Sequence, residues 1–308
     1  MARSVSWAEK HGGVIQLSGG LREEILFWRF LDSHESWSKW RGDRHTDLTL
    51  ATDASGFGWG AHISNELIIR DLWDKGDTRP IHLKEADALC KTLQSIPDMI
   101  SDKRLDVLVD NQALVKVWEN QSGKDLALVN MLKALVVFLS NLNCDLRLLY
   151  VRSADNLADG PSRKISEADA RLTMPSWAKV EGWFGPHTFD LMALDSNSMK
   201  GPDGRRLPHF TPWPLPDSSG VNIFAQQLSK EQNYYVFPPF NMVGAVMSFV
   251  LHDCPTPLSV SMVIPKPTPI PAWWPLLVHR SVHCHKLGEQ GRLGIVECPS
   301  PSSNGICG

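Results

Sequence analysis

Hydrophobic and polar positions alternate in short runs around residue 50, and this spacing predicts three β-strands. Leu48, Leu50 and Thr52 alternate with more polar neighbours, as expected for a strand whose successive side chains point to opposite faces. The run ends at the turn-forming residues 53–56, alternation returns over residues 59–63, and residues 67–69 form a third apolar run. The short connections between these runs predict an antiparallel meander.

Farther along the chain, apolar residues recur every three and four positions, which is typical of helices. The spacing predicts a helix over residues 82–96 that ends at Pro97, since proline disrupts a helix interior. We then expect strands at 105–110 and 146–151, helices at 113–118 and 126–142, and a short helix opening at 156–159. The apolar run 134–139 predicts burial on most sides of its helix. This order predicts an α/β domain with a mixed five-stranded sheet and flanking helices.

The regions on either side of this domain have a different character. Residues 1–46 are rich in tryptophan and have helical spacing, which predicts a connecting helix and linker. Residues 164–285 form a separate region with dense prolines between 202 and 275, several tryptophans and weaker strand signals. Residues 286–308 end in a run of proline, serine and glycine that predicts a disordered tail.

The overall composition excludes several classes of protein. Hydrophobic residues make up 43% of the chain and charged residues 21%, a balance that allows a buried core and excludes wholesale disorder. The apolar runs are too short to span a bilayer, and the six scattered cysteines do not resemble a disulfide framework. We therefore expect an intracellular protein, in the cytoplasm or nucleus, that has no membrane partner.

The acidic excess of the chain lies in one segment. Residues 47–163 carry 13 Lys and Arg against 17 Asp and Glu, whereas both flanking regions are nearly balanced. Proteins that bind nucleic acid normally show the opposite balance. If this segment handles phosphates, it therefore needs bound cations.

Four acidic residues of this segment stand where predicted elements begin or end. Asp53 ends the first strand, Glu85 lies in the first turns of a helix, Asp110 ends the fourth strand and Asp159 begins the last helix. Elements that end at one side of a sheet converge, so we expect these carboxylates to line one pocket. Close carboxylates repel unless a cation is present, and oxygen-only ligands favour Mg²⁺, with Mn²⁺ as a substitute. Two Mg²⁺ ions would balance the excess of four negative charges.

Each of these residues has a simpler interpretation when it is considered alone. Asp53 and Asp159 stand in turn-like sequences, Glu85 suits a solvated helix surface, and Asp110-Asn111 suits a cap of the helix that follows. Only the joint pattern favours a common site over these interpretations.

Four motifs in this segment resemble those of a known family. Residues 52–61 (TDASGFGWGA), 85–88, 110–111 and 156–163 (NLADGPSR) occur in the order and with the spacing of a ribonuclease H domain. The segment most resembles the ribonuclease H domain of DIRS-type retrotransposon reverse transcriptases, and next that of gypsy-type elements. Residues 1–46 resemble the connection that precedes this domain. The resemblance implies a fragment or decayed copy of a longer polyprotein, with its polymerase domain as a partner.

The resemblance also implies an activity and a set of site residues. The expected function is Mg²⁺-dependent hydrolysis of the RNA strand of an RNA–DNA hybrid by two metal ions. Asp53, Glu85, Asp110 and Asp159 would be the catalytic, metal-binding residues, and Ser55, Asn111 and Gln112 are candidate substrate contacts or solvated surface residues. Residues 150–155 depart from the family, because they contain neither the histidine nor the Pro-Gly of its usual turn.

Segments of the second half resemble the Dam-like adenine methyltransferase region that follows ribonuclease H in DIRS-type elements. The segments are 189–191, 196–197, 236–240 (VFPPF) and 273–274. In such enzymes an Asp or Asn before the Pro-Pro pair accepts a hydrogen bond from the target base. The resemblance implies a second α/β domain of methyltransferase-like fold over residues 164–285. Phe237 occupies the acceptor position and cannot accept the bond, so we expect this domain to have lost catalysis. A rigid Pro-Pro connector is the alternative.

Three functional hypotheses therefore follow from the sequence. The first is the hybrid-specific endonuclease, the second a non-catalytic nucleic-acid-binding relic, and the third a DNA adenine methyltransferase, which Phe237 disfavours.

Overall fold

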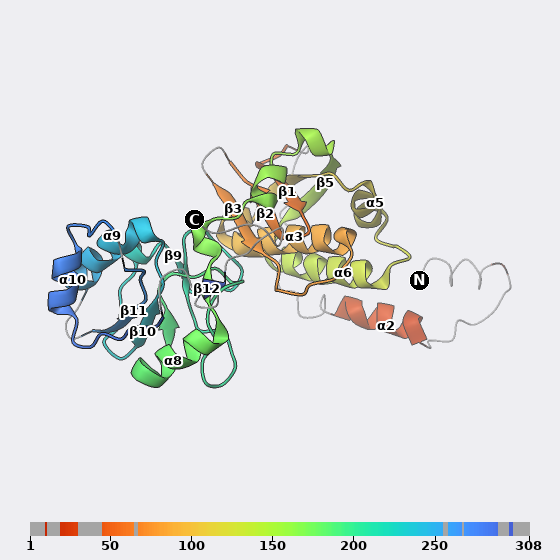
Figure 1. Ribbon diagram of the computed structural model, residues 1–308. Coiled ribbons are helices and arrows are strands. Elements are labelled where there is room, and N and C mark those ends of the chain that lie inside the picture. The colour runs from red at the N-terminus through yellow and green to blue at the C-terminus, as the bar shows by residue number, and fades with distance from the viewer. Residues whose placement is uncertain are drawn as a thin grey trace.

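The computed structural model describes residue 10 and residues 19–29, 45–64, 67–254, 258–266, 268–288 and 296–297 (Figure 1). The first described helix, α2 (Gly19–Phe27), falls where the sequence predicts a connecting helix. In the described part of the chain, none of the helices has both the length and the apolarity that a bilayer span requires.

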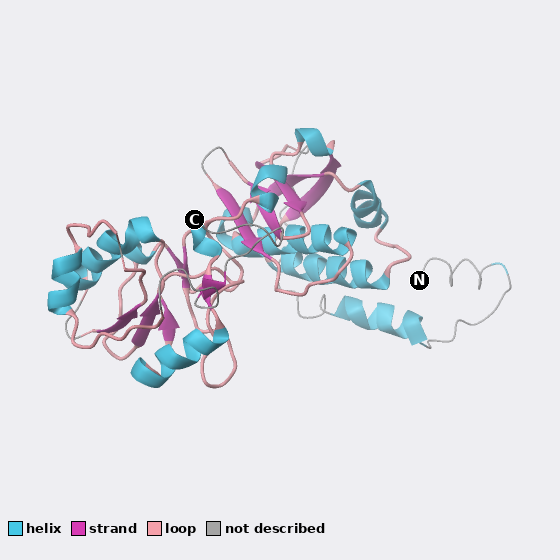
Figure 2. Ribbon diagram, in the orientation of Figure 1, coloured by secondary structure: helices cyan, strands magenta, loops and turns pink. Residues whose placement is uncertain are grey.

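Five strands form the main sheet, as the alternation of residues predicts (Figure 2). They are β1 (Leu48–Ala54), β2 (Gly58–His62), β3 (Ile68–Leu72), β4 (Arg104–Val109) and β5 (Asp145–Tyr150). Their order across the sheet is β3-β2-β1-β4-β5. The first three strands are antiparallel neighbours, whereas β4 is parallel to both β1 and β5. The predicted mixed five-stranded sheet is therefore confirmed.

The helices of this half also agree with the predicted order. They are α3 (Ile81–Ser95), α4 (Pro97–Ile100), α5 (Gln112–Asn120), α6 (Leu126–Asn141) and α7 (Asp159–Arg163), with the 3₁₀ turn η2 (Ser153–Asp155) before α7. Helix α3 packs against β1, β2 and α6. Pro97 does end α3, but it also begins α4 at the first helical position, where its missing N–H costs nothing.

The prediction that α6 is buried on most sides is wrong. Its buried residues form a single stripe, Leu128, Leu132, Leu135 and Leu139, whereas Leu126 is 73% exposed. The reason is that α6 contacts α3 through one face only, so the apolar residues between the stripe positions stay partly exposed.

The second half contains a smaller parallel sheet and several short elements. Strands β7 (Phe189–Asp190), β10 (Asn233–Val236) and β11 (Ser259–Met262) are parallel in the order β11-β10-β7. Two further pairs are β6 (Arg171–Leu172) with β12 (Val296–Glu297) and β8 (Phe210–Thr211) with β9 (Gly220–Val221). Its helices are α8 (Met174–Phe184), α9 (Val243–Ser248), α10 (Trp274–Arg280), the 3₁₀ turns η3 (Glu167–Asp169), η4 (Ile223–Ala225) and η5 (Phe240–Met242), and the π-helix η6 (Phe249–Asp253).

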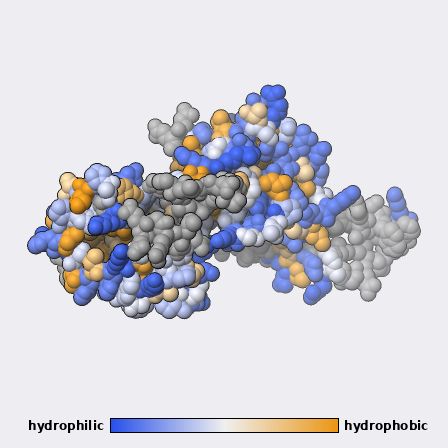
Figure 3. All heavy atoms as spheres, viewed as in Figure 1, coloured by the Kyte–Doolittle hydropathy of each residue, from blue (hydrophilic) through white to orange (hydrophobic). Residues whose placement is uncertain are grey.

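An α/β second half was predicted, and its small parallel sheets agree with that class. Strand β12 lies inside the segment predicted as a disordered tail, 286–308, and the residues after this strand lie outside the described residues. On the face shown in Figure 3, hydrophobic residues are interspersed among hydrophilic ones over both halves.

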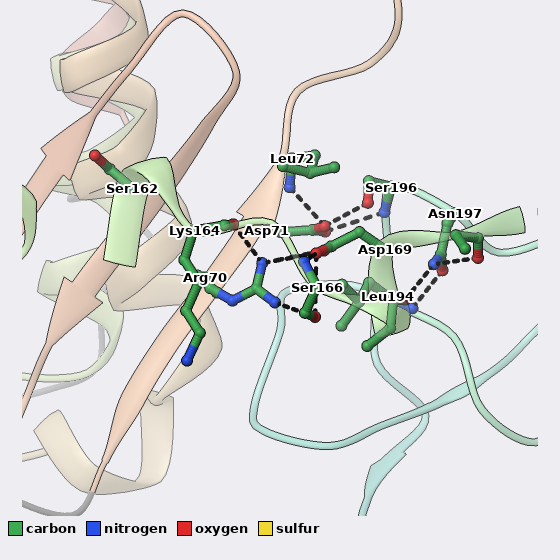
Figure 4. A network of polar contacts seen from close by, with 12 residues as sticks. Arg70, Asp71, Leu72, Ser162, Lys164, Ser166, Asp169, Leu194, Ser196 and Asn197 are labelled. Carbon is green, nitrogen blue, oxygen red and sulfur yellow. Dashed lines mark hydrogen bonds and ion pairs between the residues drawn. The ribbon is translucent and has the colours of Figure 1, made fainter. Parts of the chain in front are cut away.

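The two halves meet along β3, the edge strand of the main sheet (Figure 4). Leu194 and Leu215, from the second half, are buried in the same hydrophobic cluster as the residues of the main sheet. Trp213 packs against this cluster, and its indole Nε1 donates a 2.8 Å hydrogen bond to the backbone oxygen of Arg70. The core of the first half is therefore completed by residues of the second.

Candidate active site

The four acidic residues singled out from the sequence stand at one end of the main sheet. Strands β1 and β4 are parallel, with Ala51 opposite Leu108, so Asp53 and Asp110 follow two residues later at the same end. Glu85 lies in the second turn of α3, which packs on β1. Asp159 is the first residue of α7, which packs on both β1 and β2.

Electrostatic interactions connect the four carboxylates. Asp53 is 5% exposed, and burial raises its pKa, an effect that a hydrogen bond from Ser162 opposes and that Asp110 and Asp159 strengthen. Burial likewise raises the pKa of Glu85, and the charges of Asp110 and Asp53 raise it further. Burial is the larger cause of both shifts, and the smaller effect of Asp110 on both groups places it within electrostatic range of Asp53 and Glu85.

Each of the four carboxylates also has a non-acidic hydrogen-bond partner from its own chain. The pairs are Asp53 with Ser162 (2.5 Å), Asp110 with Ser153 (2.6 Å), Asp159 with Arg163 (2.9 Å) and Glu85 with Asn111. The bond to Asp159 raises the pKa of the Arg163 guanidinium. These bonds fix the orientation of each acidic side chain.

The donor set of this site consists of carboxylate oxygens, which is the type of ligand that Mg²⁺ and Mn²⁺ prefer. An ionised carboxylate has about four lone-pair sites, so one hydrogen bond leaves each group able to accept further bonds. Among the described residues, no group of three or more His, Cys, Asp or Glu side chains is placed to bind one metal ion together. The residues fit Mg²⁺ by their chemistry, and joint ligation requires the side chains to turn toward one point.

Close packing of α7 on β2 sets the distance between Ser162 and Asp53. A Cβ on Gly60 would lie 2.6 Å from Ser162 N and 2.7 Å from the Pro161 carbonyl carbon, closer than non-bonded atoms allow. Behind this contact, Ser55 Oγ donates a 2.7 Å hydrogen bond to Ser162 O. Only glycine at position 60 lets the helix approach this closely.

The three candidate substrate contacts differ in their surroundings. Ser55 is 4% exposed and its hydroxyl is bonded to Ser162 O inside the protein. Asn111 is the N-cap of α5, where its Oδ1 accepts a 3.0 Å bond from Leu114 N. The alternative interpretation of this segment as a helix cap is therefore confirmed for Asn111. Gln112 is exposed at the start of α5, so it is the one of the three whose side chain faces solvent.

Two hydrogen-bond partners of these carboxylates, Ser153 and Ser162, are absent from the sequence prediction. Ser162 lies three residues after Asp159, a spacing that places two residues on one side of a helix, so this signal was available. Ser153 lies in the turn that departs from the family pattern, and no feature of the sequence marks it. Gly60 was also detectable, because glycine inside a strand often marks a close backbone approach.

In the second half, a small cavity lies at the ends of β7 and β10. Asp190, Tyr235 and Phe237 are among its lining residues. Burial raises the pKa of Asp190 to about 6, and the buried Tyr235 hydroxyl has no hydrogen-bond partner within the described part of the chain. Phe237 directly follows β10, where the methyltransferase resemblance expects a hydrogen-bond acceptor.

Comparisons with known proteins give only distant structural similarities. No family model and no curated protein matches the chain. LC11-RNase H1, solved in complex with an RNA/DNA hybrid, shares 18% identity over 37% of this chain and 93% of its own, with a TM-score of 0.32. RNase H1 from Halobacterium salinarum NRC-1 shares 18% sequence identity; the match covers 37% of this chain and 92% of that protein, with a TM-score of 0.29. The N-terminal RNase H domain of a Mycobacterium tuberculosis protein shares 14% sequence identity; the match covers 38% of this chain and 94% of that chain, with a TM-score of 0.30.

Proposed function

We propose that this protein is a Mg²⁺-dependent endonuclease that hydrolyses the RNA strand of RNA–DNA hybrids. The proposal depends above all on Asp53, a buried carboxyl whose pKa is raised by burial and by the nearby charges of Asp110 and Asp159. Like charges gathered at one end of a sheet repel and destabilise a fold unless a cation or a proton neutralises them. Perturbed carboxylates brought together from separate elements are a common property of catalytic sites.

Asp53, Glu85, Asp110 and Asp159 are the residues that would hold two Mg²⁺ ions, for which Mn²⁺ is a substitute. When bound, the ions supply a water of lowered pKa as the nucleophile and stabilise the leaving 3′-oxygen. Asp53 is the most enclosed of the four residues by its place inside β1. We therefore expect the site to depend most on Asp53.

The remaining residues of the site orient the carboxylates. Ser162 holds one oxygen of Asp53 and leaves the other available. Asn111 holds Glu85 while it also caps α5. Gln112 is the proposed contact to the hybrid, because RNA is distinguished through hydroxyls in a shallow minor groove and an exposed amide both donates and accepts hydrogen bonds.

The test is cleavage of a labelled RNA–DNA hybrid by the full chain with Mg²⁺, compared with the isosteric variant Asp53→Asn. We expect the variant to lose at least about a hundredfold in rate, since a metal site contributes several kcal/mol to catalysis. Asp98→Asn is the matched control, because Asp98 is exposed in α4, ahead of the start of β4. Equal rates for Asp53→Asn and the wild type would contradict the proposal.

A second candidate function, non-catalytic binding of nucleic acid, is favoured by one observation. All four carboxylates are hydrogen-bonded to their own chain, and the described residues form no ready-made metal cluster. Calorimetry with Mg²⁺ separates the two candidates. Two sites of millimolar or tighter affinity support the endonuclease, whereas hybrid binding without Mg²⁺ binding or cleavage supports the binding protein.

We propose no methyl transfer by the second half, because Phe237 cannot accept the hydrogen bond that adenine would donate. Incubation of the full chain with DNA and a labelled methyl donor is expected to leave the DNA unlabelled. Transfer of label would show that the second half is an active methyltransferase. We also propose that the protein binds the polymerase domain of a parent element, which co-purification would test.

A further inference from the structure

A buried side chain of the main sheet, that of Arg70, bonds to the C-terminal end of α7. Arg70 lies on β3 and is 5% exposed. Its Nη1 donates a 2.9 Å hydrogen bond to the backbone oxygen of Lys164, the residue at which α7 ends. The same guanidinium bonds to Ser166 Oγ (2.7 Å) and to both carboxylate oxygens of Asp169 (3.1 Å), as Figure 4 shows.

The charge of Arg70 is matched inside the interface between the two halves. The Asp169 side chain is fully buried, and the guanidinium also lies 5.2 Å from the centre of the Trp213 ring. Removal of one partner of such a buried pair leaves an uncompensated charge. The contact therefore requires the residues that follow α7.

Helix α7 matters to the site because it carries both Asp159 and Ser162. The helix has five residues, too few to be stable by itself. Its position is set by the close contact of Gly60 with Pro161 and Ser162 and by the contacts of Arg70 after its last residue. A shift of α7 would move Ser162 away from Asp53.

We propose that Arg70, together with Asp169, is a positioning residue of the site, which holds α7 so that Ser162 stays bonded to Asp53. This inference depends on the proposed function, because the positioning serves catalysis only if Asp53 is catalytic. It makes the second half of the chain a structural part of the site.

The test follows Asp53 itself and needs no cleavage assay. In the full chain, the Asp53 carboxyl is titrated by carbon NMR, and exchange of the Ser162 amide proton is measured. In Asp169→Asn we expect Asp53 to titrate at higher pH, because the opposing bond from Ser162 weakens. We also expect the Ser162 amide to exchange about tenfold faster or more, as for loss of a charge-assisted hydrogen bond.

Two further variants make the test specific. Arg70→Lys keeps the charge but loses the forked donors. It should shift the Asp53 titration and the Ser162 exchange in the same direction as Asp169→Asn, but by less. If Asp169→Asn does not fold, Arg70→Lys takes its place in the test. Arg206→Ala removes another ion pair between the halves, Arg206 to Asp74 at 2.5 Å, which does not involve α7. It should leave the titration of Asp53 unchanged.

The inference is overturned if Asp169→Asn and Arg70→Lys leave Asp53 and the Ser162 amide unchanged, or if Arg206→Ala moves them equally. Failure of the proposed function looks different. In that case the wild type does not cleave the hybrid, while the Asp53 titration still responds to Asp169→Asn, which supports the positioning contact.

Discussion

The Ser162 hydroxyl donates a 2.5 Å hydrogen bond to Oδ2 of Asp53, although 109 positions separate the two residues in the chain. Both residues are almost completely buried, at 2% and 5% exposure. The bond favours the ionised carboxyl, whereas burial and the neighbouring acids favour the protonated one. The protonation of Asp53 therefore depends on how α7 lies against β1.

Replacement of Ser162 by alanine is expected to raise the pKa of Asp53 further. The bond from Ser162 is the largest contribution that lowers this pKa, and alanine cannot donate it. An Mg²⁺ ligand must be ionised. As the pH is lowered, the variant should therefore lose hybrid cleavage at a higher pH than the wild type does. Carboxyl NMR and cleavage rates between pH 5 and 9 measure the two effects.

Ser153→Ala is the control for this prediction, because Ser153 bonds to Asp110 and not to Asp53. It should shift the Asp53 titration less than Ser162→Ala does. Identical Asp53 titrations in the wild type and Ser162→Ala would show that the bond has no influence on the site.

Gly60→Ala is expected to destabilise the protein and impair the site together. The added methyl group would lie within 2.7 Å of the backbone at Pro161 and Ser162, and backbone atoms cannot turn away as a flexible side chain can. Such overpacking typically costs about 1–3 kcal/mol, and displacement of α7 should also raise the pKa of Asp53. Urea unfolding and the Asp53 titration provide the measurements.

Gly160→Ala, in the same helix, is the matched control, because a Cβ at this position has no atom within 4 Å. Alanine favours helix over glycine by roughly 0.5–1 kcal/mol, so this variant should be as stable as the wild type or slightly more so. If both glycine variants behave alike, the close approach at Gly60 is not what positions α7.

Asn111→Asp is expected to preserve the start of α5 while it disturbs Glu85. Asparagine and aspartate cap helices about equally well, so the free energy of unfolding should change little. The substitution nevertheless replaces a donor to Glu85 by a negative charge, and both changes raise the pKa of Glu85. Asn111→Ser, which caps without adding charge, should raise the pKa of Glu85 by less. Equal titrations of Glu85 in the two variants would exclude the like-charge effect.

The periodicity of residues 48–151 was enough to predict the main sheet and its helices. Strand β1 is buried on both faces over its last five residues, where Asp53 lies. The positions of the four acidic residues followed from the same boundaries. The apolar run of α6 misled the prediction, because composition does not reveal how many neighbours a helix has.

The partners of the carboxylates could not be predicted in the same way. Ser162 reaches Asp53, and Ser153 reaches Asp110, only after distant segments have packed together. Likewise, nothing in the sequence around Arg70 indicates that its partner is Asp169, 99 positions away. In the second half, strands of two to four residues are too short for alternation to identify them.

Asp71 gives the interface between the halves a pH dependence of predictable sign. Burial raises its pKa to about 7, although the backbone and hydroxyl of Ser196 and the backbone of Leu72 donate hydrogen bonds to it. The folded state therefore keeps the proton up to about pH 7, whereas an unfolded aspartate releases it near pH 3.8. Its contribution to stability is complete below the lower value and is lost as the pH rises through the higher one.

Between pH 5 and pH 8 the free energy of unfolding falls by about 3 kcal/mol. The loss is about 1.36 kcal/mol for each pH unit between pH 5 and the folded pKa. Asp71→Asn cannot titrate, so the difference in unfolding free energy between wild type and variant should change by about that amount over the interval. Urea unfolding at both pH values, followed by circular dichroism, measures it. Asp74→Asn, in the neighbouring contact to Arg206, should leave the wild-type pH dependence in place. A constant difference between the wild type and Asp71→Asn would mean that Asp71 is already ionised in the interface at pH 5, and that its hydrogen bonds outweigh its burial.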